Sequence, residues 1–266
     1  MSELDLGREE LRELATQVIA AAGDPTEPFG VYLFLPEQPE SELPRSVERA
    51  VFDEFFGNSA ELLDAEYGEY EPSSYFICVL DHRRRLPAGS GRVTMPSARG
   101  FKTLVDIEAI WQRPIDDVVA HTEVDWAIDE VWDAVTIAVA PEYRGKATDG
   151  LISLSMLQAG TMGMRMCGGR IWVAILDLEA RAAINVAIHD AWQPFADLEP
   201  MRYLDSPLSV PCFVDTTAFE PTLQAADPIM HDIIYRGVGI EAMVRPPVFD
   251  PLLQRMAVQP RPPATR

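Results

Sequence analysis

The sequence has little lysine, little positive charge overall and no long apolar run. Lys102 and Lys146 are its lysines, and 22 basic residues stand against 42 acidic ones, for a formal net charge of −20. Nonspecific binding to nucleic acid depends on basic side chains that neutralise phosphates, so this balance argues against it. No apolar run approaches the roughly 18 residues that a membrane span requires. We therefore expect no nucleic-acid partner and no membrane span.

Cysteine is also scarce. Cys78, Cys167 and Cys212 are odd in number and far apart, and Cys78 and Cys212 fall within strand-like segments. This pattern favours buried thiols in a reducing compartment. No Cys/His spacing resembles a zinc site, so we expect no metal. The acidic N-terminal sequence lacks the basic and apolar regions of a secretory signal, and we predict a cytoplasmic protein.

Apolar residues are plentiful: they make up 47% of the 266 residues, enough to bury a sizeable core. We divide the chain into an N-terminal helix and extension (1–44), a central domain (45–222) and a C-terminal extension (223–266). The extension is rich in Pro and Arg from Pro246 onward, and we expect its end to be poorly ordered.

Hydrophobic periodicity predicts the elements of the central domain. Helices are expected over 42–56, 150–166 and 179–191, and strands over 74–81, 91–95, 132–139 and 170–176. Residues 86–91, Leu-Pro-Ala-Gly-Ser-Gly, are expected to form the turn between the first two strands. The acidic segment 107–129 suits either helix or loop. The order of elements indicates a mixed α/β sheet with helices on both faces.

The most informative segment is Trp132–Gly150, where a buried strand stops at a proline, passes through an Arg-Gly-Lys turn and opens a helix. A helix N-terminus leaves backbone N–H groups without intrahelical partners and carries the positive end of the helix dipole, which favours anions. The small residues Gly145, Ala147 and Gly150 let a phosphate approach the backbone. We expect any cofactor phosphates to bind here.

This segment resembles the GCN5-related N-acetyltransferase (GNAT) superfamily, whose Arg/Gln-x-x-Gly-x-Gly/Ala turn binds the pyrophosphate of acyl-CoA. The resemblance implies an α/β fold with a mixed, mostly antiparallel sheet. It also implies a donor site on the preceding strand and at the turn, with acetyl-CoA or a longer acyl-CoA as the donor. The residues concerned are Ile137, Ala138, Val139, Arg144, Gly145, Lys146, Ala147 and Gly150. The chain departs from the pattern at Ala147 and at Asp149, whose carboxylate would oppose a pyrophosphate.

A narrower resemblance links the chain to acyl-homoserine-lactone synthases and N-acyl amino acid synthases. It rests on Arg49 and Phe52 in an early helix, on acidic residues in 64–71, and on Arg92. These relatives commonly take the acyl group from acyl carrier protein, which is acidic. The matching basic residues here would be Arg83, Arg84, Arg85, Arg99 and Lys102. Alternatively, 83–85 form a solvated hairpin tip.

Acyl transfer to an amine needs a base and a proton donor. Four carboxylates are candidate bases, and Asp133 is preferred because it lies on the central strand; the four are Glu123, Asp125, Glu130 and Asp133. The helix after the fifth strand lacks the tyrosine that relatives often use. His189 could donate the proton in its place, because the ordinary pKa of a histidine side chain lies near neutrality. The alternative is a partly exposed helix histidine.

Other enzyme classes lack their motifs, since the chain contains neither a Gly-x-Ser-x-Gly elbow nor a Walker loop. The sequence therefore favours an N-acyltransferase that moves an acyl group from acyl-CoA or acyl carrier protein to the amine of a small molecule. The alternative is a catalytically inactive GNAT-like module for ligand binding or protein interaction. An open gap between strands 132–139 and 170–176 would favour the enzyme. A gap filled by Trp172 or Met164 would favour the module.

Overall fold

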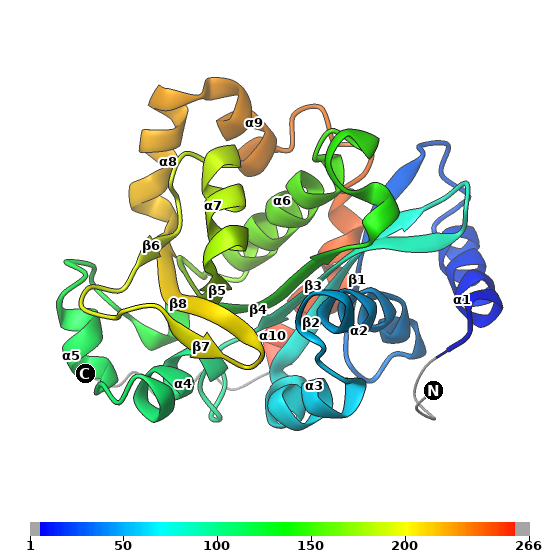
Figure 1. Cartoon of the computed structure of the whole chain (residues 1–266). Coiled ribbons are helices and arrows are strands. Elements are labelled where there is room, and N and C mark those ends of the chain that lie inside the picture. The colour runs from blue at the N-terminus through cyan, green and yellow to red at the C-terminus, as the bar shows by residue number, and fades with distance from the viewer. Residues whose placement is uncertain (1–5, 259–266) are drawn as a thin grey trace.

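One eight-stranded sheet organises the chain, of which the computed structural model describes residues 6–258 (Figure 1). The strand order is β1-β2-β3-β4-β5-β8-β6, with β7 beside β8. The pair β4/β5 is parallel and the other pairs are antiparallel. The strands are β1 (Phe29–Phe34), β2 (Ser74–Asp81), β3 (Leu86–Thr94), β4 (Val131–Val139), β5 (Ile171–Asp177), β6 (Gln193–Pro194), β7 (Met201–Tyr203) and β8 (Ser206–Asp215). The predicted mixed, mostly antiparallel α/β fold is confirmed.

Helices cover both faces of the sheet (Figure 1). They are α1 (Arg8–Ala21), α2 (Glu42–Phe56), α3 (Ala60–Tyr67), α4 (Lys102–Ile110), α5 (Ile115–Ala120), α6 (Leu151–Met166), α7 (Leu178–Ala187), α8 (Thr216–Ala226), α9 (Pro228–Arg236) and α10 (Asp250–Val258). The main core lies between the sheet and α6 to α10, and smaller cores lie beneath α1, α2, α4 and α5 on the other face. Among residues 6–258, no helix is long and apolar enough to cross a membrane.

Strand β2 lies between the helices that cover the two faces of the sheet, and all its residues are buried. Side chains alternate between the two faces of a strand. Accordingly, Ile77 and Val79 belong to the core on the α6 face, whereas Cys78 and Leu80 pack on the α1 face. The predicted burial of Cys78 is confirmed.

The hairpin between β2 and β3 differs from the predicted one. Residues 86–91, expected as a turn, lie within β3, and the turn is formed by 82–85. The Asp81 carboxylate holds this turn by accepting hydrogen bonds from the backbone N–H groups of Arg83 and Arg84, both at 2.9 Å. Gly89 lies within the strand, and its missing side chain lets α6 approach closely: a Cβ there would lie 2.6 Å from Ile152.

The structure also bears on three other expectations. Helix α7 ends at Ala187, not at residue 191. The uncertain segment 107–129 contains the end of α4 and all of α5. The proposed domain divisions at 44/45 and 222/223 fall inside α2 and α8, and β1 belongs to the same sheet as the central strands. The C-terminal extension packs on α6 through Phe249 and Leu252, and the end that was expected to be poorly ordered reaches into 259–266, outside the described residues.

Candidate functional site

Strands β4 and β5 separate after a short parallel contact. They pair only at Val131–Asp133 with Ile171–Val173, and the rest of β4 runs beside β3 alone. In an antiparallel pair, alternate residues direct their peptide groups away from the partner strand. Beyond Asp133, those groups of β4 therefore face a gap where β5 no longer pairs.

A β-bulge interrupts β4 at the start of this gap. Arg92 pairs with Thr136 and Val93 pairs with Ala134, so Val135 has no opposite residue on β3. A bulge inserts one residue and re-aims the side chains that follow it. Asp133 and Ile137 consequently lie on opposite faces of the sheet, although four positions separate them.

A pocket of about 700 Å³, counting space open to solvent, lies beside the gap on the α6 face. Its walls come from β2, β3, β4, β5, β8, α6, the segment after α7, and the α8–α9 pair. The lining residues are Ile77, Gly91, Val93, Ala134, Thr136, Ile137, Met156, Leu157, Gly160, Thr161, Trp172, Ile188, Ala191, Trp192, Val214, Thr216, Phe219, Ile234 and Tyr235. Trp172 is one wall of the open pocket, and Met164 packs elsewhere, against Gly169. The lining is almost entirely apolar.

The turn after β4 faces open space. Two short 3-10 helices, Pro141–Tyr143 and Gly145–Ala147, lead into α6. Gly145 and Gly150 have positive φ angles of 57° and 77°, and no other atom lies within 4 Å of a Cβ placed at either position. Among residues 6–258, no side chain caps α6. The Leu151 N–H donates to the Thr148 carbonyl at 2.9 Å, and the N–H groups that follow it in the first turn remain available to an anion.

The Arg144 side chain is held at the edge of this turn. Its Nε donates to the carbonyl oxygen of Val139 at 2.7 Å, and Nη2 contacts the Glu54 carboxylate at 3.0 Å. Its guanidinium carbon also lies 4.6 Å from the centre of the Phe55 ring. An anion at the turn would therefore compete with Glu54 for Arg144.

The remaining turn residues are mostly exposed. Lys146, Ala147 and Asp149 all reach solvent, and Asp149 adopts a left-handed conformation with φ of 48°. Tyr143 is buried; its hydroxyl donates to Asp81 at 3.0 Å, and its carbonyl accepts from the Thr148 hydroxyl at 2.8 Å. The tyrosine thus ties the turn to the β2–β3 hairpin.

That contact brings part of the expected basic surface to the turn. Arg83, Arg84 and Arg85 are exposed on the hairpin, and the Arg84 guanidinium carbon lies 5.4 Å from the centre of the Tyr143 ring. The other two expected residues lie elsewhere. Arg99 pairs with Glu69, and Lys102 is buried with its ammonium 2.8 Å from both Glu66 and Asp106.

Asp133 lies on the α4 face and is completely buried. Its oxygens accept hydrogen bonds from the backbone N–H of Thr103 at 2.9 Å and from the Thr103 hydroxyl at 2.7 Å. Burial raises the pKa of Asp133 to about 6, although the two Thr103 bonds act in the opposite direction. This geometry holds the first turn of α4, and Asp133 does not line the pocket.

The other catalytic candidates are also outside the pocket lining. His189 follows α7 in a left-handed conformation with φ of 49°, and its Nε2 lies 3.3 Å from the Asp227 carboxylate. Glu130 pairs with Arg170, and Glu123 and Asp125 are exposed. Within the described chain, no pocket-lining residue is a carboxylate.

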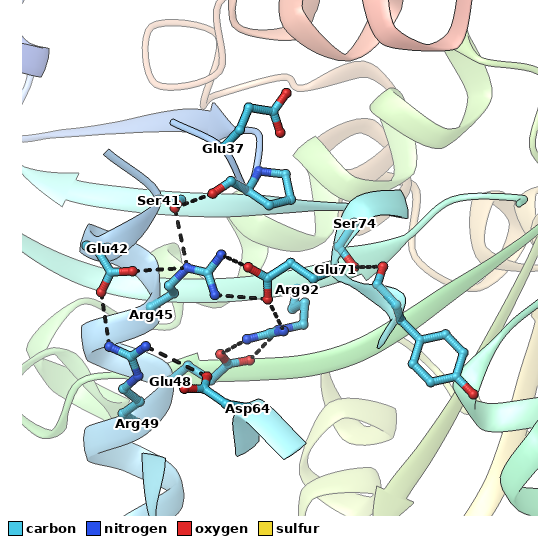
Figure 2. A network of polar contacts seen from close by, with 12 residues as sticks. Glu37, Ser41, Glu42, Arg45, Glu48, Arg49, Asp64, Glu71, Ser74 and Arg92 are labelled. Atoms are coloured by element: carbon cyan, nitrogen blue, oxygen red, sulfur yellow. Dashed lines mark hydrogen bonds and ion pairs between the residues drawn. The ribbon is translucent and has the colours of Figure 1, made fainter. Parts of the chain in front are cut away.

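A buried ionic network lies between β4 and α2, on the α2 face of the sheet (Figure 2). The sequence did not indicate it. Arg92 Nη2 lies 2.7 Å from Glu48 Oε2, with side-chain exposures of 2% and 1%. Thr136, the residue after the bulge, also donates to Glu48. Burial raises the pKa of Glu48, but the Arg92 charge and the bonds from Arg92 and Thr136 outweigh it, so the pKa lies below its usual value.

The network extends to Arg49, the other arginine of the narrower resemblance. Arg92 reaches Glu71 at 3.4 Å, and Arg45 joins Glu71, at 3.0 Å, to Glu42, at 3.3 Å. Arg49 in turn pairs with Glu42 at 3.0 Å and with Asp64 at 3.8 Å. One sequence signal could have indicated Glu48: it precedes Val51 by three residues and so lies on the same helix face as that apolar position.

No family model matches the chain, and no curated protein matches its sequence. Solved structures match its fold. FeeM, an N-acyl amino acid synthase from uncultured soil microbes, aligns with a TM-score of 0.55 and 10% identity, covering 74% of this chain and 97% of FeeM. The AHL synthase LasI aligns with a TM-score of 0.48 and 12% identity, covering 71% and 89%. A putative GNAT-family acetyltransferase from Desulfovibrio desulfuricans gives 0.44 and 14%, covering 71% and 99%.

These identities make the likeness one of fold. The chain shares its fold with FeeM, and the resemblance to N-acyl amino acid synthases that the sequence suggested is confirmed at that level.

Proposed function

We propose that the protein is an N-acyltransferase that moves an acyl group from acyl-CoA, or from acyl carrier protein, to the amine of a small molecule. One observation carries the proposal: an open apolar pocket adjoins the separation of β4 and β5, on the strand that leads to an uncapped helix N-terminus. An apolar chain and a phosphate, joined by a pantetheine arm, fit these features together. The structural neighbour FeeM, named an N-acyl amino acid synthase, supports this assignment.

The donor would occupy the site in three parts. Its phosphates would bind at the turn, through Arg144, Lys146 and the backbone of Gly145, Ala147 and Gly150. Its pantetheine amides would pair with β4 over residues 137–139, as an added strand does, except at the Val139 carbonyl, which already accepts from Arg144. The acyl chain would enter the apolar pocket, where burial of each methylene favours binding.

In this arrangement the amine nitrogen attacks the thioester carbonyl carbon, the C–S bond breaks, and the thiolate takes up a proton. A backbone N–H of β4 at the gap would stabilise the oxyanion, because a fixed donor needs no reorganisation during the reaction. Since the pocket lining holds no carboxylate, we propose that the proton of the amine leaves through water. Asp133 and His189 are not assigned to this step.

The donor could also arrive on a carrier protein. Arg84 lies against Tyr143 next to the turn, and Arg83 and Arg85 flank it on the exposed hairpin, so an acidic protein that delivers a pantetheine arm would meet positive charge there. Arg99 and Lys102 are paired with acidic residues and are not part of this proposed surface.

A catalytically inactive binding module is the second candidate. It is favoured by Arg144, which already contacts Glu54, and by the Asp149 carboxylate at the turn. Both features would weaken a pyrophosphate contact without affecting the apolar pocket. Such a protein would bind an apolar ligand and transfer nothing.

Thermal unfolding with added ligands tests the proposal. Acetyl-CoA, dodecanoyl-CoA, free coenzyme A and acylated carrier protein would each be added at about 100 times Kd, where binding stabilises by about 2.7 kcal/mol. For a chain of this size that corresponds to a rise in Tm of roughly 5–10 °C. Arg144→Glu should abolish the rise, and Glu54→Gln should increase it by releasing Arg144.

Arg202→Glu is the matched control, because Arg202 is exposed and lies in β7, away from the turn. It should leave every shift unchanged. If none of the four ligands raises Tm, the proposal of an acyltransferase is wrong. If Tm still rises in Arg144→Glu, the phosphates do not bind at the turn. Binding of acyl donors without product formation from any amine would support the inactive module.

A further inference from the structure

Two glycines stand on the wall of the pocket, in places where regular structure disfavours glycine. Gly91 lies inside β3, and Gly160 lies inside α6. Glycine in the middle of a strand or helix is less stable than alanine, because it loses more conformational freedom on folding. Neither residue has a positive φ angle. Their presence therefore calls for a reason other than backbone conformation.

Close packing is not that reason. A Cβ at Gly91 would lie 3.7 Å from the Ile77 Cβ and 3.8 Å from the Thr136 carbonyl oxygen. A Cβ at Gly160 would lie 3.4 Å from the Ile77 Cδ1 and 3.6 Å from the Trp172 ring. These are ordinary contact distances, unlike the 2.6 Å approach at Gly89. What the two glycines leave free is space within the pocket.

The two positions lie at different depths. Gly91 is opposite Ile137 in the β3/β4 register, beside the gap where the thioester would lie. Gly160 is next to Trp172, whose strand still pairs with β4 at that level. Ile77 contacts both positions and stands between them. Phe219 of α8 and Ile234 of α9 also line the pocket.

We propose that Gly91 and Gly160 determine the length of acyl chain that the pocket accepts. Gly91 keeps the entrance wide enough for an acyl chain of any length, and Gly160 keeps the inner part open for longer ones. This inference rests on the proposed function, in which the pocket takes the acyl chain. It assigns specificity to residues whose backbone, not side chain, forms the wall.

Calorimetric titration with acyl-CoA esters of increasing length tests the assignment. The series runs from acetyl- through butyryl-, hexanoyl-, octanoyl-, decanoyl- and dodecanoyl- to tetradecanoyl-CoA. For the unaltered protein, Kd should fall about fourfold per added methylene, until the chain fills the pocket and Kd levels off. In Gly160→Leu, Kd should level off at a shorter chain, and Kd for the long esters should rise more than Kd for acetyl-CoA. Gly91→Val should weaken binding of every ester longer than acetyl.

Gly68→Leu is the matched control, because Gly68 is exposed and no other atom lies within 4 Å of a Cβ placed there. It should reproduce the unaltered series. Near-ultraviolet circular dichroism would show that each variant is folded. If Gly160→Leu does not fold, Gly160→Ala replaces it and should shift the levelling in the same direction by less.

The outcomes separate this inference from the proposed function. If the unaltered protein binds the series but a folded Gly160 variant levels off at the same chain length, the role of Gly160 is wrong and the acyl-donor site stands. If the unaltered protein binds no ester, the proposed function fails, and this inference fails with it.

Discussion

Removing one charge from the buried Glu48–Arg92 pair should strongly destabilise the protein. The two side chains share two contacts, at 2.7 Å and 3.1 Å, and are 1% and 2% exposed. Loss of one partner from a buried pair costs about 3–5 kcal/mol, because the other charge stays desolvated. In Glu48→Gln, Arg92 keeps a 3.4 Å contact with Glu71. We therefore expect Glu48→Gln to lower the free energy of unfolding by about 3 kcal/mol, the lower end of this range.

Arg92→Met should cost more than Glu48→Gln. The Glu48 carboxylate would keep the Thr136 hydroxyl as a bonding partner but lose its strongest opposing charge. The double variant removes both charges from the interior, so its cost should be smaller than the sum of the two single costs. A coupling of about 1–3 kcal/mol is expected for residues in direct contact.

Urea and thermal unfolding of the four proteins measure this cycle. For Glu48→Gln the expected fall in Tm is about 6–12 °C, at roughly 2–4 °C per kcal/mol. Asp205→Asn is the control: the Arg202–Asp205 pair has a similar distance, 2.9 Å, but is exposed. An exposed pair contributes about 0–1 kcal/mol. A Glu48→Gln cost no larger than the control, or strictly additive single costs, would refute the reasoning.

The remaining predictions concern the two residues nominated from the sequence as catalytic. Because burial raises the pKa of Asp133 to about 6, the folded state binds its proton more tightly than the unfolded chain does. Its ionisation should therefore lower the free energy of unfolding by up to about 3 kcal/mol as pH rises from about 4 to 6. Asp133→Asn should remove this slope in urea titrations, and an unchanged slope contradicts the assignment. His189→Gln should leave kcat unchanged, because His189 contacts Asp227 outside the pocket. A fall in kcat of about 100-fold, typical of a lost general acid, would show instead that His189 is the proton donor.

The sequence predicted the strand, turn and helix of 132–166 well, because each signal there is local. An apolar run, a proline that ends the strand, and small residues before an apolar helix specify their own conformation. Helix α2 and strand β2 were predicted for the same reason. The observed bounds of β4 and α6 differ from the predicted ones by a residue at their starts.

Features that depend on contacts between residues far apart in the sequence were not predicted. Gly89 looks like a turn residue until Ile152 of α6 is placed against it, so the sequence put a turn where β3 runs. The partner of Glu48 lies 44 residues further along the chain. Nothing in local spacing identifies such a partner, because it depends on how α2 crosses the sheet.

The position of Asp133 shows how one inserted residue changes a functional assignment. Strict alternation would place 133, 135, 137 and 139 on one face, so an acid at 133 would point to the same side as the donor-binding positions. The bulge at Val135 breaks that alternation. Ile137 then faces the pocket, while Asp133 bonds Thr103 on the opposite face.

The same bulge places the polar and the apolar contacts of β4 on opposite faces of the sheet. On the α2 face, Thr136 donates to Glu48, which Arg92 holds ionised, so a charged network fixes the strand where its pairing with β3 resumes. On the α6 face, Ala134 and Ile137 border an apolar pocket. A charge facing that pocket would oppose an acyl chain, and an apolar residue at Thr136 would leave Glu48 with one bond fewer. The register after the bulge therefore lets one strand form both a buried polar contact with Glu48 and the wall of an apolar pocket.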